Sequence, residues 1–338
     1  PPIVQMFTGF ATGVFEEVLE LNTIYQGDVL EQLQSFPDEC IQCVVTSPPF
    51  WNLRDYGVDG QIGLEDTPEE YVDTMVSVFQ EVKRVLRKDG TVWLNLGDSY
   101  SAGKMTPHTG AARNGRDMSA MSGIIRTYNK PKNLVGIPWR VAFALQADNW
   151  YLRQDIIWHK PNPMPESVTD RCTKSHEYIF LLTKSAKYFY DADAIREPLQ
   201  SGPSDIKKMI ENKDRIDAKH LKDDYPLHKA NTRSKIGRKR AVGTMNQEGL
   251  LGRNRRSIWK INTTPYPEAH FAVFPEKLPE LCIKAGSREG DTILDPFFGA
   301  GTTGFMAQRL GRKWIGIELS EDYIKIAEKR LAQREIFA

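Results

Sequence analysis

The sequence predicts an α/β protein with a doubly wound, Rossmann-like sheet and an inserted basic region. Short apolar runs alternate with amphipathic helical patterns along most of the chain. Two of the apolar runs end in Pro- or Gly-rich turns, Thr46–Phe50 and Asp295–Gly304. A segment rich in Lys and Arg separates the two patterned parts. Strand, tight turn and helix in succession are typical of open sheets that bind ligands at their strand ends.

The first patterned part covers residues 22–195 and includes a long basic loop at 101–133. Thr67 is a helix cap, followed by Pro68 in the first turn and Glu70 three residues after the cap. We expect this helix to run to Asp89-Gly90. The other elements expected here are strands at Thr23–Gln26, Ile41–Val45, Thr91–Leu96 and Tyr151–His159, helices at Val29–Phe36 and Pro138–Asp148, and a hairpin of Tyr178–Thr183 with Tyr188–Tyr190.

The second patterned part covers residues 258–335. Strands are expected at Thr292–Leu294 and Trp314–Ile317, with a helix at Thr303–Leu310 between them. Ser320 is the expected cap of the final helix. The inserted region, residues 196–257, lacks this alternation.

Composition excludes several classes of protein. The chain has 338 residues, of which 40% are apolar, and no apolar run is long enough for a membrane helix. Four cysteines are too few for a disulfide scaffold. Cys40 and Cys43 have no second pair to complete a zinc site, so we expect buried thiols and no metal. With no secretory signal visible, an intracellular location is expected, in the cytoplasm or nucleoid of a prokaryote.

The charge is uneven although the formal net charge is only +1. Residues 201–256 carry fifteen Lys or Arg against seven Asp or Glu, and the remainder of the chain is acidic. The stretch 103–132 is also basic, with a single acidic residue, Asp117. A basic region on an acidic body favours a polyanionic partner, the alternative being an ordinary solvated surface.

The turn at Asp295–Gly304 has the features of a nucleotide site. Gly299 and Gly301 permit a tight turn close to a ligand, and the following helix begins with free N–H groups. Glu318 ends the next strand, where nucleotide-binding α/β folds hold ribose hydroxyls. A dinucleotide-dependent oxidoreductase would use the same features, but it leaves the Thr46–Phe50 turn unexplained.

The segment Ser47-Pro48-Pro49-Phe50, followed far along the chain by Asp295–Thr303, resembles a known family. In this order the two segments resemble the beta group, circularly permuted, of S-adenosylmethionine-dependent DNA amino-methyltransferases. The resemblance covers roughly residues 22–190 and 258–335. It implies a catalytic part at 22–195, a donor-binding part at 258–335 and a target-recognition region at 196–257. It further implies S-adenosylmethionine as donor, S-adenosylhomocysteine as product and double-stranded DNA as partner, and leaves a homodimer open.

The chemistry of Ser47–Phe50 fits amine methylation. A conjugated exocyclic amine is a poor nucleophile, and acceptors aimed at its two N–H groups favour a pyramidal nitrogen. Ser47 Oγ and the Pro48 carbonyl are the expected acceptors, because Pro48 and Pro49 stiffen the turn. Phe50 offers a flat face to a base flipped out of the duplex. Asp98, at the end of another strand, either accepts a hydrogen bond or proton from the amine or caps a helix.

The resemblance also implies binding residues. Asp28 is expected at the donor's adenine amine, Glu318 at its ribose, and Phe274 and Lys277 near its methionine part. The complete set of expected donor-binding residues is Asp28, Thr46, Phe274, Lys277, Asp295, Phe297, Gly299, Gly301, Thr302, Thr303 and Glu318. The expected DNA-binding residues are Arg113, Arg116, Arg233, Lys235, Arg238, Lys239, Arg240, Arg253, Arg255 and Arg256.

The residue before the two prolines indicates the base. Family members that methylate cytosine N4 mostly carry Ser there, and adenine-N6 members mostly carry Asp, so Ser47 favours N4-methylcytosine. Adenine N6 stays open as a target, as do RNA or a small-molecule amine, or a catalytically idle nucleic-acid-binding subunit. Methylation at cytosine carbon 5 is disfavoured because that reaction uses a thiolate, typically after a proline, and no cysteine here follows one.

Overall fold

The computed structural model forms two compact units, Pro1–Tyr190 with Ser257–Ala338, and Asp191–Arg256. The second unit covers nearly the same residues as the region for which the sequence predicts target recognition, and that role stays a prediction. The structure describes residues 3–6, 18–101, 130–198, 244–245, 251–263 and 275–332.

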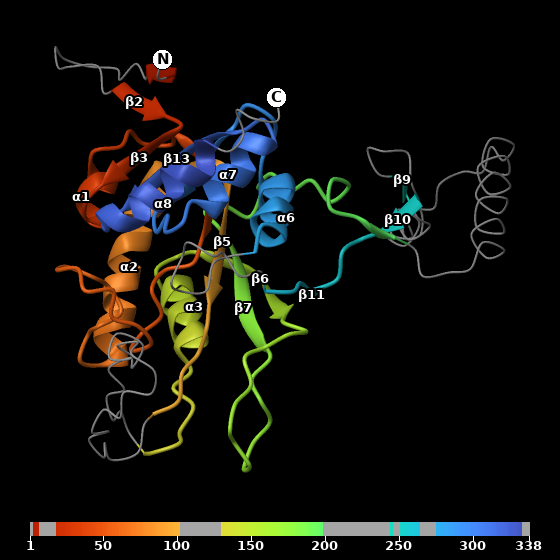
Figure 1. Cartoon of the computed structure of the whole chain (residues 1–338). Helices are drawn as coiled ribbons and strands as arrows, with labels where there is room; N and C mark the ends of the chain where they lie inside the picture. Colours follow the sequence, from red (N-terminus) through yellow and green to blue (C-terminus); the bar gives the residue numbers. More distant parts are fainter. Residues whose placement is uncertain are drawn as a thin grey trace, which may run out of the picture. The chain divides into compact units, whose positions relative to one another are not determined.

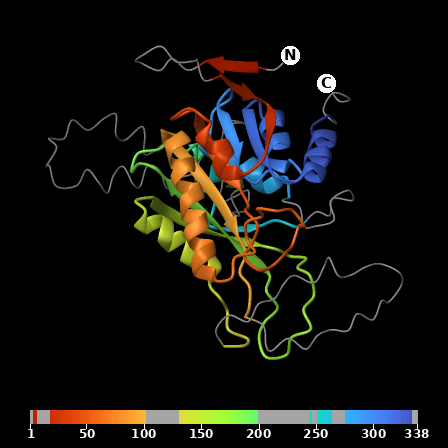
Figure 2. The same ribbon diagram turned by 90° about the vertical axis from the view of Figure 1, so that its left-hand side faces the viewer.

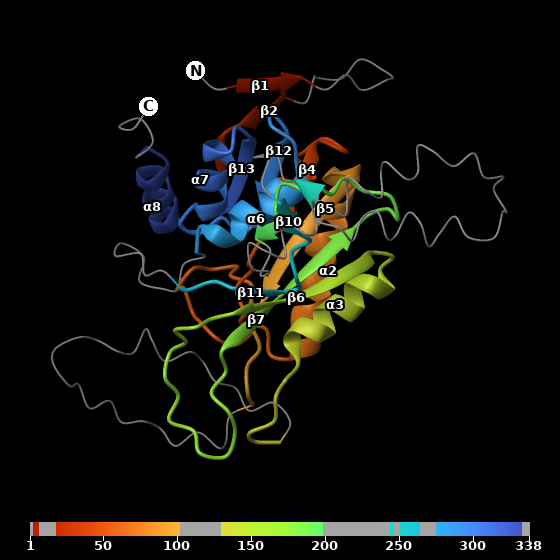
Figure 3. The ribbon, with the colours of Figure 1, turned by 90° about the vertical axis from the view of Figure 1, so that its right-hand side faces the viewer.

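The first unit is built on an eight-stranded sheet with the order β11-β6-β7-β5-β4-β12-β13-β3 (Figures 1 and 3). β7 is antiparallel to both of its neighbours, and the other pairs are parallel. The strands are β3 (Thr23–Gln26), β4 (Ile41–Thr46), β5 (Leu86–Leu96), β6 (Tyr151–His159), β7 (His176–Thr183), β11 (Ile258–Lys260), β12 (Thr292–Asp295) and β13 (Lys313–Glu318). The predicted doubly wound α/β fold is confirmed.

Two further sheets are small. β1 (Ile3–Met6) and β2 (Val18–Leu21) form an antiparallel pair in the first unit. In the second unit, β8 (Glu197–Pro198), β10 (Leu251–Arg253) and β9 (Thr244–Met245) form a three-stranded antiparallel sheet in that order.

Helices cover both faces of the large sheet (Figure 2). One layer contains α1 (Val29–Gln34), α2 (Pro68–Val85) and α3 (Ile137–Ala147), and the other contains α6 (Lys277–Gly286), α7 (Thr302–Arg309) and α8 (Glu321–Ala332). From β4 the chain crosses through α2 to β5, whereas from β12 it crosses through α7 to β13, in the opposite direction along the sheet. β4 and β12 are neighbours, so their carboxyl ends form the topological switch point where open α/β sheets bind ligands.

Helix α2 begins where the sequence predicts and ends earlier than predicted. The Thr67 hydroxyl accepts from the Glu70 N–H, and the Glu70 carboxylate accepts from the Thr67 N–H, which forms a capping box. The helix was expected to reach Asp89-Gly90 but ends at Val85. Leu86 is instead extended, pairs with Ile41 of β4, and packs against Gly90, where an added Cβ would lie 2.7 Å from the leucine side chain.

The expected hairpin of β7 with Tyr188–Tyr190 is wrong. β7 is hydrogen-bonded to β5 on one side and to β6 on the other, so both of its edges are occupied. Tyr188–Tyr190 forms no strand. Instead, the Phe189 N–H donates to the carbonyl of Asp89 at 2.8 Å.

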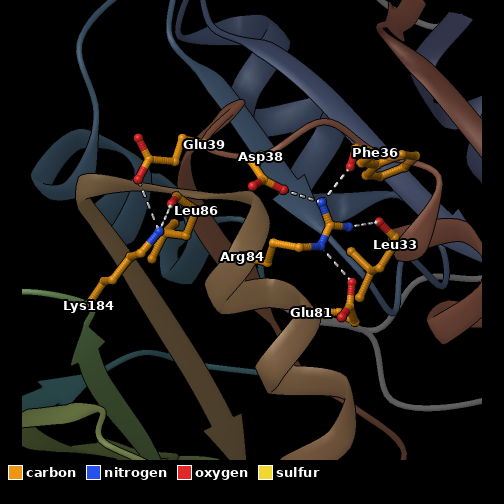
Figure 4. A network of polar contacts seen from close by, with 8 residues as sticks. All are labelled: Leu33, Phe36, Asp38, Glu39, Glu81, Arg84, Leu86 and Lys184. Carbon is orange, nitrogen blue, oxygen red and sulfur yellow. Dashed lines mark hydrogen bonds and ion pairs between the residues drawn. The ribbon is translucent and has the colours of Figure 1, made fainter. Parts of the chain in front are cut away.

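A polar network fixes α2 to the beginnings of β4 and β5 (Figure 4). The Arg84 guanidinium donates to the carbonyls of Leu33 and Phe36 at 2.7 and 2.8 Å, which ties α2 to the end of α1 and to the segment before β4. The Lys184 ammonium donates to the Leu86 carbonyl at 2.9 Å. Carboxylates complete the network, with Asp38 and Glu81 beside Arg84 and Glu39 beside Lys184.

The cysteines behave as expected from their spacing. Cys40 and Cys43 are buried free thiols, and Cys43 lies inside β4. Burial raises the pKa of both thiols to about 12. They are therefore packing residues. In the part of the chain that the structure describes, no helix combines the length and apolar character needed to span a bilayer.

Candidate active site

A cavity of about 400 Å³ lies at the carboxyl ends of β4, β5, β12 and β13. Its wall contains both turns that the sequence singled out, Ser47–Phe50 after β4 and Asp295–Ala300 after β12. The sheet order explains this meeting of distant segments, because β4 and β12 are adjacent and parallel.

The buried carboxylate of Asp295 ties the two turns together. Thr46 Oγ1 and Thr303 Oγ1 each donate to it at 2.7 Å, and the Phe297 N–H donates at 3.1 Å. Burial raises the pKa of Asp295 to about 7, although the two hydroxyl donors oppose the shift. Thr46, predicted to bind the donor, does not line the cavity. Its hydroxyl instead joins β4 to a residue 249 positions away.

The turn after β12 takes its shape from the backbone. Gly299 and Gly301 have φ values of 51° and 73°, a left-handed conformation that favours glycine. A Cβ on Gly301 would also lie 2.9 Å from Cβ of Ala327 in α8. Glu318, at the end of β13, accepts from the Gly299 N–H at 2.7 Å and from the Ser320 N–H at 2.9 Å. Burial raises the pKa of the Glu318 carboxyl, which lines the cavity.

Ser47 is oriented by an amide on the adjacent strand. Its hydroxyl donates to Asn95 Oδ1 at 3.0 Å, and the Asn95 Nδ2 donates to the carbonyl of Tyr178 on β7 at 3.0 Å. The second hydrogen bond sets which end of the amide faces Ser47. Because the hydroxyl proton is directed at Asn95, the lone pairs of Ser47 Oγ are left to accept a hydrogen bond.

The rest of this turn is held from α2 and β5. The hydroxyl of Tyr71, a buried residue whose pKa is raised by desolvation, donates to the Pro49 carbonyl at 2.9 Å. Among the described residues, no hydrogen bond to the Pro48 carbonyl is found. The Phe50 ring lies over Gly97, where an added Cβ would come within 2.5 Å of Phe50 Cε2.

Asp98, predicted as a catalytic residue or a helix cap, has the contacts of a cap. Its Oδ1 accepts from the N–H groups of Ser99, Gly136 and Ile137 at 2.9, 2.9 and 3.1 Å. Gly136 precedes α3 and has no side chain of its own to cap that helix, so Asp98 supplies the acceptor. Asp98 does not line the cavity. The structure therefore favours the capping role.

The other predicted donor-binding residues divide into two groups. Asp28, Phe297, Thr302 and Thr303 line the cavity. One oxygen of Asp28 caps α1 by accepting from two backbone N–H groups at 2.9 and 3.1 Å. Lys277 does not line the cavity and pairs with Glu280 of the same helix at 2.9 Å. Phe274 lies outside the described residues.

The structure describes only three of the predicted DNA-binding residues. Arg253 pairs with Glu197 at 2.9 Å, and Arg255 donates to the Ile195 carbonyl at 2.8 Å. Arg256 has a largely exposed side chain. The predicted residues outside the described part are Arg113, Arg116, Arg233, Lys235, Arg238, Lys239 and Arg240.

Sequence reasoning missed several polar residues that line the cavity. They include Asn95 on β5, Glu177 on β7 and Lys160 directly after β6. Each lies at or beside the end of a strand. The signal in the sequence was therefore a polar residue beside an apolar run, which becomes informative only once the order of the strands is known.

The comparison with protein families decides the class. The family model described as DNA methylase, of the N6/N4 methyltransferases, matches residues 41–329. The chain belongs to this DNA methylase family. The expected resemblance to DNA amino-methyltransferases is thereby confirmed.

Relatives of this DNA methylase include type II methyltransferases. M.SmaI of Serratia marcescens is 46% identical, over 94% of this chain and 95% of the relative. M.Cfr9I of Citrobacter freundii is 44% identical, over 93% of this chain and 90% of the relative. The likeness therefore extends over nearly the full length of both proteins.

A solved structure shares the fold of this DNA methylase. The PvuII DNA methyltransferase, cytosine-N4-specific, aligns with a TM-score of 0.58 at 21% identity, over 91% of this chain and 85% of the other. A putative DNA modification methylase of Thermus thermophilus, complexed with S-adenosyl-L-methionine, aligns with a TM-score of 0.54 at 24% identity, over 92% and 93%.

Proposed function

We propose that this DNA methylase transfers a methyl group to the exocyclic N4 amine of a cytosine flipped out of double-stranded DNA at a specific site. The observation that carries the proposal is the Ser47–Asn95 hydrogen bond, which directs the serine proton away from the amine. The similar fold of a cytosine-N4-specific methyltransferase supports the choice of base. The near full-length relatives support a type II methyltransferase role.

The methyl donor is S-adenosylmethionine, whose sulfonium makes the methyl group electrophilic. The cavity suits it chemically. The Glu318 carboxylate lines the cavity and would accept from ribose hydroxyls, and the second oxygen of Asp28 would accept from the adenine amine. The N–H groups at the start of α7 suit the donor's carboxylate. These residues are the proposed donor-binding set, together with Phe297, Thr302 and Thr303.

The chain's own residues would activate the amine. Ser47 Oγ and the Pro48 carbonyl accept its two N–H groups, which frees the nitrogen lone pair for in-line attack on the methyl group. Phe50 stacks on the ring of the base. The prolines and the Tyr71–Pro49 hydrogen bond keep these acceptors in place, so little reorganisation is needed in the transition state.

DNA binding is proposed for the basic residues of the inserted region. Substituting Arg238, Lys239 and Arg240 by Gln should weaken binding and lower the slope of log K against log salt by about one per lost phosphate contact. Titrations of a labelled duplex at several salt concentrations measure the slope. An unchanged slope would remove this basic run from the DNA interface.

Nucleoside mass spectrometry tests the target base. Unmethylated genomic DNA is incubated with the protein and isotope-labelled S-adenosylmethionine, then digested to nucleosides. Labelled N4-methylcytosine is the expected product. N6-methyladenine would leave the DNA methylase class intact and overturn the proposed base, in line with the second target of the family.

A further inference from the structure

The ion pair of Lys160 and Glu177 lines the cavity beside the amine-binding turn, and the proposed methyl transfer gives it no role. Both side chains are largely buried, with 19% and 15% of their surface exposed. Removing two charges from water costs solvation free energy, and a buried ion pair seldom adds net stability. Stability alone therefore does not explain the pair, and its place in the cavity suggests that it binds a ligand.

The strand register places this pair on the same face of the sheet as Ser47. Leu96, the last residue of β5, pairs with Tyr178 of β7, so the next positions along the two chains are Gly97 and Glu177. Glu177 in turn pairs with Trp158 of β6, and Lys160 follows Trp158 by two residues, on the same face. Across this face of the sheet the order is therefore Ser47 and Asn95, then Phe50 above Gly97, then Glu177 and Lys160.

The ammonium of Lys160 is held in position before any base arrives. Glu177 binds it directly, and the ammonium lies 4.3 Å from the centroid of the Trp158 ring. Trp158 is itself fixed, because its indole N–H donates to the carbonyl of Ile261 at 2.9 Å. A lysine ammonium has three N–H donors, so a donor remains for a ligand after the bond to Glu177.

Cytosine has an acceptor that matches this arrangement. Along the edge of its ring the N4 amine is followed by N3 and then by the carbonyl oxygen O2. If N4 lies at Ser47 and the ring lies on Phe50, O2 is at the far end of the edge, toward Lys160. Adenine carries a C–H group at the corresponding place, which would leave the ammonium without an acceptor.

We infer that Lys160 determines base specificity by donating a hydrogen bond to O2 of the flipped cytosine, and that Glu177 positions its ammonium. This inference rests on the proposed function. The expected loss on removing the contact is about 10- to 100-fold in kcat/KM, the range for a hydrogen bond to a charged group. A site that hydrogen-bonds one substrate rejects an analogue without the acceptor, because the site's own polar group is then unpaired.

The test pairs a protein change with a change in the base. Two duplexes are compared that differ only at O2 of the target base, one with cytosine and one with 2-thiocytosine, whose sulfur is a much weaker acceptor. Wild-type protein should methylate the cytosine duplex about 10- to 100-fold faster, measured as kcat/KM. The double variant Lys160→Met, Glu177→Gln removes the pair without leaving a lone buried charge, and it should bring the ratio near one.

Controls separate specificity from folding and from the proposed function itself. Lys160→Arg keeps a charged donor and should retain most of the oxygen-to-sulfur preference, and donor affinity should be unchanged in every variant. An equal loss on both duplexes would overturn the inference and indicate a structural or phosphate-binding role. The wild-type product reports the proposed function separately. If that product is N6-methyladenine, both conclusions fail, because adenine has no O2.

Discussion

The two turns that meet at the switch point are built by different means. The turn after β12 depends on the left-handed backbone of two glycines, and a carboxylate from β13, that of Glu318, accepts from the Gly299 N–H. The Ser47–Phe50 turn is shaped by side chains, with two prolines and a carbonyl held by Tyr71. We expect the first to control donor affinity and the second to control turnover. Substitutions in each turn can therefore test whether binding and chemistry are separable.

Ser47→Ala should have the largest effect. It removes one of the two acceptors proposed for the amine, and losses of about 100- to 1000-fold in kcat are typical when a preorganised transition-state contact is removed. Donor affinity, measured by calorimetry, should stay within about twofold. The matched control is Ser77→Ala on the exposed side of α2, which should keep full activity. A tenfold rise in the donor Kd of Ser47→Ala would contradict the division between the turns.

Glu318→Gln tests the turn after β12 and should change donor affinity. It removes the charge that binds the Gly299 N–H and that is proposed to bind ribose, so donor Kd should rise about 10- to 100-fold. At saturating donor, kcat should be nearly unchanged. Glu321→Gln, three residues further and exposed in the first turn of α8, serves as the control. An unchanged Kd for Glu318→Gln would remove this residue from the donor site.

Tyr71→Phe should have a smaller effect and one confined to turnover. Without its hydroxyl the Pro49 carbonyl loses its donor, and a lost hydrogen bond of about 1 kcal/mol predicts a several-fold fall in kcat. Tyr25→Phe is the control, since its hydroxyl also donates to a backbone carbonyl, that of Glu20. Both variants should unfold at a lower temperature, but kcat should fall in Tyr71→Phe alone. Equal values of kcat would show that the hydroxyl is merely structural.

Asp295 joins the two turns, and its effect should appear as pH dependence. Its folded-state pKa of about 7 lies above the ordinary value of about 3.9, so the folded state retains a proton that the unfolded state loses. Its contribution to stability should fall as pH rises from about 4 to about 7, by at most about 1.4 kcal/mol per pH unit.

Asp295→Asn should flatten this dependence, because the amide stays neutral. Melting temperatures at pH 5 and pH 7 compare the variant with wild type and with Asp38→Asn, an exposed carboxylate. A wild-type slope that persists in Asp295→Asn would assign the pH dependence to other groups.

Periodicity and turn residues predicted the fold class and most elements of the large sheet. They did not predict that β7 lies between β5 and β6, because a pattern along the chain does not identify a strand's neighbours. For this reason Asn95, Lys160 and Glu177 were missed. Asp98 and Thr46 show a second limit. Asp98 follows a strand and Thr46 ends one. The direction of the Asp98 side chain depends on distant backbone N–H groups, and that of Thr46 on a carboxylate far along the chain.

The strand order also bears on how the protein folds as it is synthesised. β3, near the N-terminus, lies at the end of the sheet beside β13, and β12 lies between β13 and β4. When the first half of the chain leaves the ribosome, β4 can pair with β5, but its other edge must wait for β12 and β3 must wait for β13. Such long-range pairing is slow and leaves edges exposed. The cavity proposed to bind the donor therefore cannot assemble before β12 and β13 are made, and a product truncated before these strands should be unable to bind the donor.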